Sequence, residues 1–116
     1  MSWYLTIRGA PDYSQFAATA PLVEFLAMMP ELRQIGTASF QAADGQPWVS
    51  VMMFVCDKQG SYISYKALLP QINVVEVVCS CSCDPSWYED LAGRIAGFLD
   101  WSAFEDYEER QVWPPP

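Results

Sequence analysis

Residues 72–82 read INVVEVVCSCS, and residues 48–56 read WVSVMMFVC. Both runs are rich in the β-branched and aromatic residues that favour strands. Both are apolar at successive positions, which is typical of strands that are covered on two faces. We therefore predict two long strands, Ile72–Ser82 and Trp48–Cys56, and we expect Trp48–Cys56 to be central in the sheet.

Shorter strands are predicted around these two. Trp3–Arg8 is rich in β-forming residues that alternate along the chain. Gly36–Ala43 leads into Asp44-Gly45, a dipeptide typical of hairpin turns. The remaining strands are expected at Ser61–Lys66 and, near the end of the chain, at either Ala103–Tyr107 or Gln111–Trp113.

One helix is predicted between the first two strands. From Leu22 to Met29, apolar residues recur at i, i+3, i+4 and i+7, which forms one apolar stripe. Thr19 is the expected N-cap. Pro30 predicts Met29 as the last helical residue, with a further helical turn through Leu32 as the alternative.

A second helix is predicted to begin at Asp84-Pro85, because aspartate is a preferred N-cap and proline suits the first helical position. Asp90 and Arg94 are spaced to pair on its outer side. Its inward face is expected to carry Trp87, Leu91, Ile95 and Phe98.

These elements follow the order β-α-β-β-(β)-β-α-β. Strands in the middle and a helix near each end predict an α+β fold, with two helices packed on one face of a mainly antiparallel sheet of four to six strands. A chain of 116 residues suits one domain, so we expect a single domain over residues 1–116. Residues 114–116 are three prolines, which predict an extended tail.

The chain is acidic, with a net charge of −8 and a pI near 4.1. Phosphate backbones and anionic membrane surfaces would repel it, so we expect neither nucleic acid nor a membrane as partner. Residues 84–110 hold eight acids against two bases, a balance of −6. The N-terminal residues resemble a strand rather than a secretion signal, so we expect a cytoplasmic protein with reduced thiols.

The chain contains no histidine, which excludes the commonest general acid–base group and the Ser-His-Asp arrangement. Cys79, Cys81 and Cys83 alternate at the end of a predicted strand, where they would share one face, and Cys56 ends another. They are either small buried core residues or a thiol or metal site. Alternate strand positions lie ~7 Å apart, too far to share an ion easily, so we expect no metal and no cofactor.

Glu76 interrupts an otherwise apolar strand. A buried carboxylate is costly unless it is paired or hydrogen-bonded. Either Glu76 is held inside the fold by an arginine or a tyrosine, or its strand face is exposed. Exposure would place Ile72, Val74 and Val78 beside it on an open sheet face, an apolar patch suited to a partner.

The C-terminal third interleaves acids with Tyr107 and Trp113, and aromatic residues beside charges are favoured at protein interfaces. The candidate partner-binding residues are Glu76, Asp90, Asp100, Glu105, Asp106, Tyr107, Glu108, Glu109 and Trp113. No residue is assigned a catalytic role.

A small, acidic α+β chain without histidine or a catalytic signature resembles the immunity proteins of bacterial polymorphic and type VI secreted toxins. The pattern from MSWYLTI at residues 1–7 through WVSV at 48–51 to WPP at 113–115 is also similar to a further bacterial family, which brings no functional residue with it. The resemblance to immunity proteins implies a cognate toxin with a basic surface as partner, and inhibition by covering the active site of that toxin.

Two other functions stay open. One is a small enzyme that uses Cys79, Cys81 and Cys83 as a thiol or metal site. The other is a homo-oligomeric structural subunit, in which the strand face around Glu76 buries against a second copy.

Overall fold

The computed structural model describes residues 1–63 and 69–115. The elements are β1 (Ser2–Arg8), β2 (Ala17–Ala18), α1 (Thr19–Ala27), β3 (Leu32–Gly36), β4 (Ser39–Ala42), β5 (Val49–Cys56), β6 (Tyr62–Ile63), β7 (Gln71–Ile72), β8 (Val74–Ser80), α2 (Pro85–Leu99), β9 (Ser102–Glu105) and β10 (Gln111–Trp113). Both predicted positions for the last strand are therefore occupied. The predicted strand Ser61–Lys66 contains β6, while its residues 64–66 lie outside the described residues.

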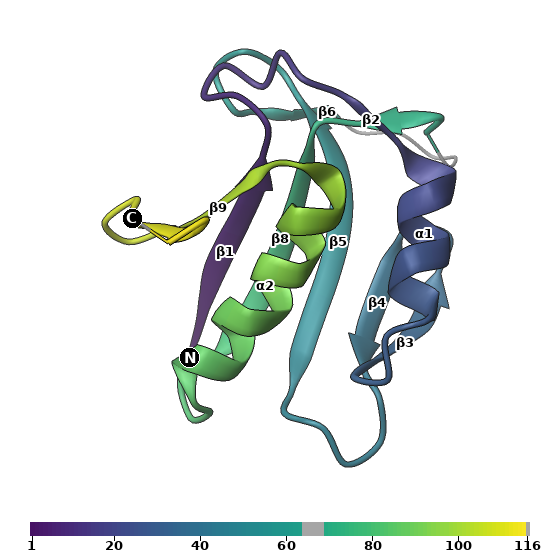
Figure 1. The fold of residues 1–116 in the computed structure, drawn as a ribbon, viewed down its shortest axis with the longest axis vertical. Helices are drawn as coiled ribbons and strands as arrows, with labels where there is room; N and C mark the ends of the chain where they lie inside the picture. The colour runs from purple at the N-terminus through teal and green to yellow at the C-terminus, as the bar shows by residue number, and fades with distance from the viewer. Residues whose placement is uncertain (64–68, 116) are drawn as a thin grey trace.

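The main sheet has eight strands (Figure 1). Seven follow one another in the order β10-β9-β1-β8-β5-β4-β3, and the eighth, β6, pairs with the C-terminal end of β5. Every observed strand pairing is antiparallel, including that of the small β2–β7 sheet. The predicted α+β fold with a mainly antiparallel sheet is confirmed, although the sheet is wider than the four to six strands expected. As predicted, β5 lies inside the sheet, between β8 and β4.

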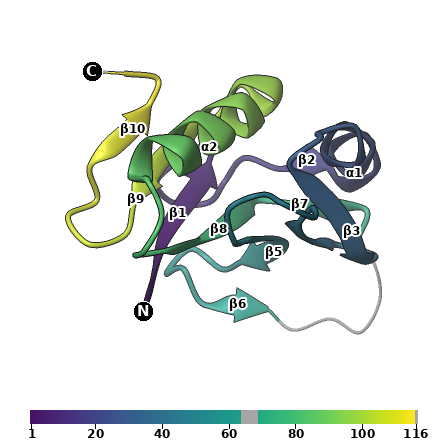
Figure 2. The ribbon, with the colours of Figure 1, turned by 90° about the horizontal axis from the view of Figure 1, so that it is seen from below.

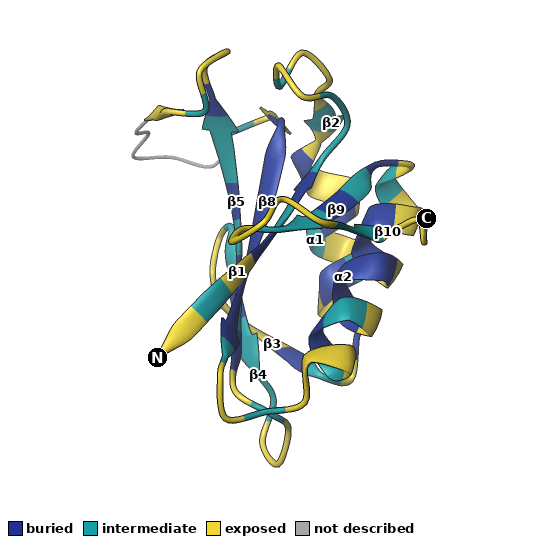
Figure 3. Ribbon diagram, turned by 90° about the vertical axis from the view of Figure 1, so that its left-hand side faces the viewer, coloured by how far each residue is buried: buried dark blue, intermediate teal, exposed yellow. Residues whose placement is uncertain are grey.

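Both helices lie on one face of the sheet, as predicted (Figures 2 and 3). The buried apolar residues of both helices belong to the same core cluster as the buried residues of the strands. Alternate strand residues face these helices, because successive side chains on a strand point to opposite faces. The core is formed by Leu5, Ile7, Val49, Val51, Val75 and Val77 from the strands and by Leu22, Leu26, Leu91 and Ile95 from the helices, all fully buried.

The region after α1 differs from the prediction. A hairpin of β3 and β4 replaces the single strand Gly36–Ala43, and Leu32 begins β3 instead of continuing a helical turn. The helix already ends at Ala27. β3 is an edge strand whose residues after Leu32 are all exposed. It therefore lacks the apolar alternation by which strands are recognised.

The predicted strand Ile72–Ser82 is two strands, because Asn73 interrupts it. The buried Asn73 side chain accepts a 2.7 Å hydrogen bond from the Cys56 backbone N–H and donates a 2.8 Å bond to the Cys56 carbonyl oxygen. The break places Ile72 in the core rather than on the open face. The Asn73 side chain thus makes the two hydrogen bonds to Cys56 that the backbone of a neighbouring strand would otherwise make.

The two predicted helix caps have different outcomes. Asp84 is the N-cap of α2, where its carboxylate accepts a 3.0 Å bond from the Ser86 backbone N–H. Thr19 is not the N-cap of α1, since Ala18 occupies that position and Thr19 is the first helical residue. Among residues 1–63 and 69–115, no helix combines the length and the apolar character needed to cross a bilayer.

Candidate functional site

The side of the sheet away from the helices is termed the open face. Its central row crosses four strands, because Phe104, Thr6, Glu76 and Met52 lie opposite one another in register. The open face comprises Tyr4, Thr6 and Arg8 of β1, Ser50, Met52 and Phe54 of β5, Val74, Glu76 and Val78 of β8, and Phe104 of β9. Its side chains are aromatic, apolar and charged, and those of β8 are buried, so Val74 and Val78 do not form the exposed apolar patch that was the second alternative for Glu76.

Glu76 lies at the centre of the open face and is only 9 % exposed. Its carboxylate accepts bonds from the Thr6 hydroxyl at 3.1 and 3.3 Å and from the Tyr62 hydroxyl at 2.8 Å. The Tyr62 ring stacks on Phe54 at 4.6 Å between ring centroids. Desolvation raises the pKa of Glu76 above its usual value, although the two hydroxyl donors act in the opposite direction. Glu76 is thus held by a tyrosine, the first of the two alternatives that the sequence left open.

Residues 105–109, from the last residue of β9 into the turn before β10, are termed the acidic turn. The Glu105 carboxylate accepts backbone N–H bonds from Tyr107, Glu108 and Arg110. Asp106 accepts a 3.0 Å bond from the backbone N–H of Tyr4. Desolvation acts to raise the pKa of Glu105, but the three backbone donors outweigh it and lower that pKa. Both carboxylates therefore hold the turn in one conformation.

The acidic turn adjoins the open face through Tyr4. The Asp106 backbone N–H also donates a 3.1 Å bond to the carbonyl oxygen of Tyr4, whose side chain belongs to the open face. At the tip of the turn, Tyr107 is 89 % exposed, and Glu108 and Glu109 are exposed beside it. Five of the predicted partner-binding residues are thus brought together in one turn.

Three other predicted partner-binding residues lie apart from the acidic turn. Asp90 pairs at 3.1 Å with Arg94, which also binds Glu31 at the start of the β3–β4 region. Asp100 is the left-handed C-cap of α2. Trp113 lies against α2, since a methyl group at Gly93 would be 3.0 Å from its Cε3 atom. These residues serve the fold at three different places.

The cysteines do not share one face, contrary to the prediction, because β8 ends at Ser80 and the chain then turns. Cys79 is fully buried in the core, Cys81 is exposed and Cys83 is half-buried. Burial raises the pKa of the Cys79 thiol to about 12 and that of Cys56 to about 11. In the described part of the chain, no three Cys, Asp or Glu side chains are arranged to hold a metal ion.

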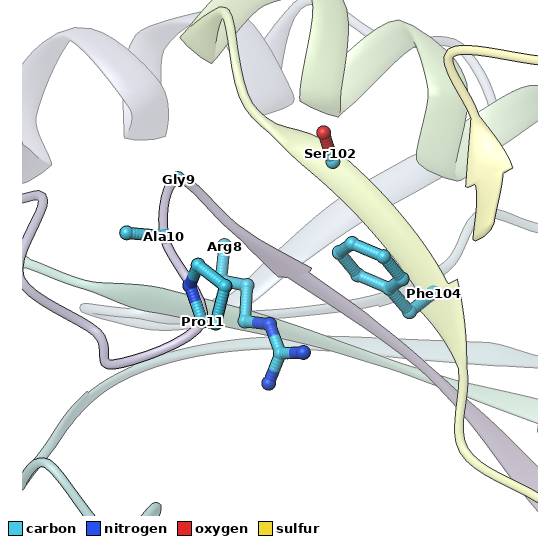
Figure 4. A pocket seen from close by; sticks show the side chains of 6 residues that line it. All are labelled: Arg8, Gly9, Ala10, Pro11, Ser102 and Phe104. Atoms are coloured by element: carbon cyan, nitrogen blue, oxygen red, sulfur yellow. The ribbon is translucent and has the colours of Figure 1, made fainter. Parts of the chain in front are cut away.

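A pocket of about 100 Å³ lies at the end of β1 and was not anticipated from the sequence. Figure 4 shows the side chains of Arg8, Pro11 and Phe104 around it. The Arg8 guanidinium lies 4.9 Å from the Phe104 ring centroid and 5.4 Å from that of Tyr13. One arginine at the end of a strand carries no sequence signal for such a site, because its neighbours come from distant segments.

No protein-family model, curated protein or solved structure matches the chain.

Proposed function

We propose that this chain is a non-catalytic protein-binding module that docks a cationic partner protein on the acidic turn and the adjoining open face. We further propose that it acts as an immunity protein in the bacterial cytoplasm and neutralises a cognate toxin by covering the active site of that toxin. The observation that supports this function best is the fixed geometry of the acidic turn.

Four of the five residues in the turn are acidic, and its backbone is fixed by the Glu105 and Asp106 carboxylates. A surface that is rigid before binding loses less conformational freedom when the complex forms. Tyr107 projects beside these charges with 89 % exposure. Tyrosine is enriched among residues that dominate interface energetics. The turn thus combines an anchor residue with a preformed anionic surface.

The charge distribution favours a basic partner. The net charge of −8 is concentrated in residues 84–110, and the acidic turn carries most of that excess. Opposite charge on the partner would accelerate encounter and fix the orientation of docking. If the active site of the toxin is cationic, the basic side chains that bind its substrate would also bind the acidic turn.

The test is coexpression with the product of the neighbouring gene, which the proposal expects to be a secreted toxin. The proposal predicts that the two proteins copurify and that the chain restores growth when the neighbouring toxin domain is produced. Glu108→Gln with Glu109→Gln should weaken both effects, because these exposed carboxylates are free to meet a partner. The matched control is Glu24→Gln with Asp44→Asn, which removes two exposed acids from α1 and from the β4–β5 turn.

Full protection from toxicity without a complex between the two proteins would contradict the proposal. Unchanged affinity in the Glu108 and Glu109 double variant would also contradict it.

A further inference from the structure

Arg8 is a half-buried cation without a carboxylate partner in residues 1–63 and 69–115. Its Nε atom is buried and has no hydrogen-bond acceptor there, and its terminal Nη1 atom donates only to the Tyr13 hydroxyl, at 3.2 Å. By contrast, Arg94 and Arg110 both bind carboxylates. A buried donor without an acceptor is unfavourable, and an anion or a water that reaches the guanidinium would complete its bonding.

The surroundings hold this guanidinium in place. Phe104 and Tyr13 both lie within cation–π distance of it. Tyr13 has a positive φ of 60°, a left-handed conformation that is rare for a bulky residue. That conformation is maintained by the Asn73 amide, which donates a 3.0 Å bond to the Tyr13 carbonyl oxygen. Backbone strain of this kind persists where the surrounding structure enforces it, and it is concentrated at binding sites.

The pocket beside Arg8 has room for a small ligand. Its volume of about 100 Å³ exceeds several-fold the roughly 10–15 Å³ that one water needs. The wall next to Arg8 is the backbone of Gly9, where a Cβ atom would lie 2.6 Å from Nε1 of Trp101. Ala10, Pro11 and Phe104 supply an apolar lining. The site therefore offers one cation and an apolar wall.

We propose that the Arg8 pocket is a binding site for a carboxylate group attached to a small apolar stem. A planar carboxylate matches the fork of a single guanidinium. A phosphate would need more positive charge than Arg8 alone supplies, and the residues that line the pocket include no second cation. The carboxylate comes from a free small acid, an acidic side chain of another protein, or the C-terminus of another protein.

The site stands independently of the proposed toxin partner, because the probe is a small molecule. Acetate is titrated into the full-length ¹⁵N-labelled protein at constant ionic strength, with acetamide as the neutral analogue of the same shape. Acetate should shift the amide resonances of Gly9, Ala10 and Ser102 and the Arg8 Nε–Hε resonance to a saturating limit. Acetamide should leave them unchanged. Equal shifts with both compounds, or shifts that chloride reproduces, would overturn the proposal.

Variants test the role of the guanidinium. Arg8→Gln should weaken acetate binding about tenfold or more, and Arg8→Lys should bind with intermediate affinity because it keeps the charge and loses the planar fork. Arg33→Gln removes an exposed arginine from β3 and should bind as the wild type does. Undiminished binding in Arg8→Gln refutes the site. If that variant fails to fold, the Nε–Hε resonance of the wild type still decides the outcome.

Three blocked peptides distinguish the sources of the carboxylate. One has a free C-terminus, one has an amidated C-terminus, and one carries a single glutamate side chain between blocked ends. Selective binding of the first assigns the pocket to a chain terminus, and selective binding of the third assigns it to an acidic side chain. Binding of acetate with rejection of all peptides assigns it to a free small acid.

Discussion

The Tyr62 hydroxyl donates a 2.8 Å hydrogen bond to Oε1 of Glu76 and thereby joins the short strand β6 to the middle of β8. Burial, followed by this hydrogen bond, raises the pKa of Tyr62 above its usual value of 10, so the hydroxyl remains a donor at neutral pH. The contact explains how an acidic residue is accommodated in the centre of the sheet.

The raised pKa of Glu76 predicts that the protein loses stability as the pH rises above 4.5. Between this usual value and the higher native pKa, the folded chain holds a proton that the unfolded chain has released. Unfolding then releases protons, so the free energy of unfolding falls with increasing pH in this window. Urea unfolding between pH 4 and 8 should show this fall in the wild type and a smaller one in Glu76→Gln. An equal slope in both proteins would contradict the pKa direction.

Removal of the Tyr62 hydroxyl should strengthen that pH dependence. Tyr62→Phe keeps the stacking on Phe54 but deletes a donor that lowers the pKa of Glu76. We expect a loss of about 1 to 3 kcal/mol at neutral pH, because a buried charge loses one hydrogen bond. Tyr4→Phe, a change on the same face, serves as the control in chemical denaturation. Equal losses in the free energy of unfolding for Tyr62→Phe and Tyr4→Phe would contradict this prediction.

The helix α2 offers a matched pair of glycine substitutions. Gly97→Ala places a methyl group 3.9 Å from Trp113, an ordinary contact, and should stabilise the protein by about 0.5–1 kcal/mol through helix propensity. Gly93→Ala places it 3.0 Å from the same ring, so Trp113 must move. We expect Gly93→Ala to gain less stability or lose some, and to change the near-UV circular dichroism. Equal gains in stability for Gly93→Ala and Gly97→Ala would show that Trp113 does not pack against Gly93.

Alkylation should separate the cysteines into two classes. Cys81 is exposed and the Tyr88 hydroxyl lowers the pKa of the half-buried Cys83. Cys79 and Cys56 are buried, with pKa values raised to about 12 and about 11. Iodoacetamide at pH 8 should therefore modify Cys81 and Cys83 in the folded protein, and Cys79 and Cys56 only after unfolding. Peptide mass spectrometry identifies the modified residues, and rapid labelling of Cys79 would contradict its place in the core.

The elements with strong local signals were predictable from the sequence. The apolar run 48–56 gave a central strand, and Asp84-Pro85 marked the start of α2, because caps and continuous apolar runs act locally. β3 escaped prediction because an edge strand needs no apolar alternation. The position of Asn73 escaped it because the reason for the break is a pair of hydrogen bonds to Cys56, 17 residues away.

The candidate sites were predictable only in part. The acids and Tyr107 of residues 105–109 lie together as the sequence predicts, because they are contiguous and one turn holds them. Asp90, Asp100 and Trp113 were grouped with them by sequence proximity, which the helix and its cap do not preserve. The Arg8 pocket depends on contacts between β1, the loop at Tyr13 and β9, and such contacts leave no local pattern.

The rate of association with the cognate toxin, measured by stopped flow against ionic strength, tests most directly whether the acidic turn docks a basic partner. We expect the association rate of the wild type to fall steeply with salt. The Glu108→Gln and Glu109→Gln double variant should associate up to about tenfold more slowly at low salt, with a shallower salt dependence, while Glu24→Gln with Asp44→Asn matches the wild type. Identical rates and salt slopes for all three proteins would contradict the proposed docking surface.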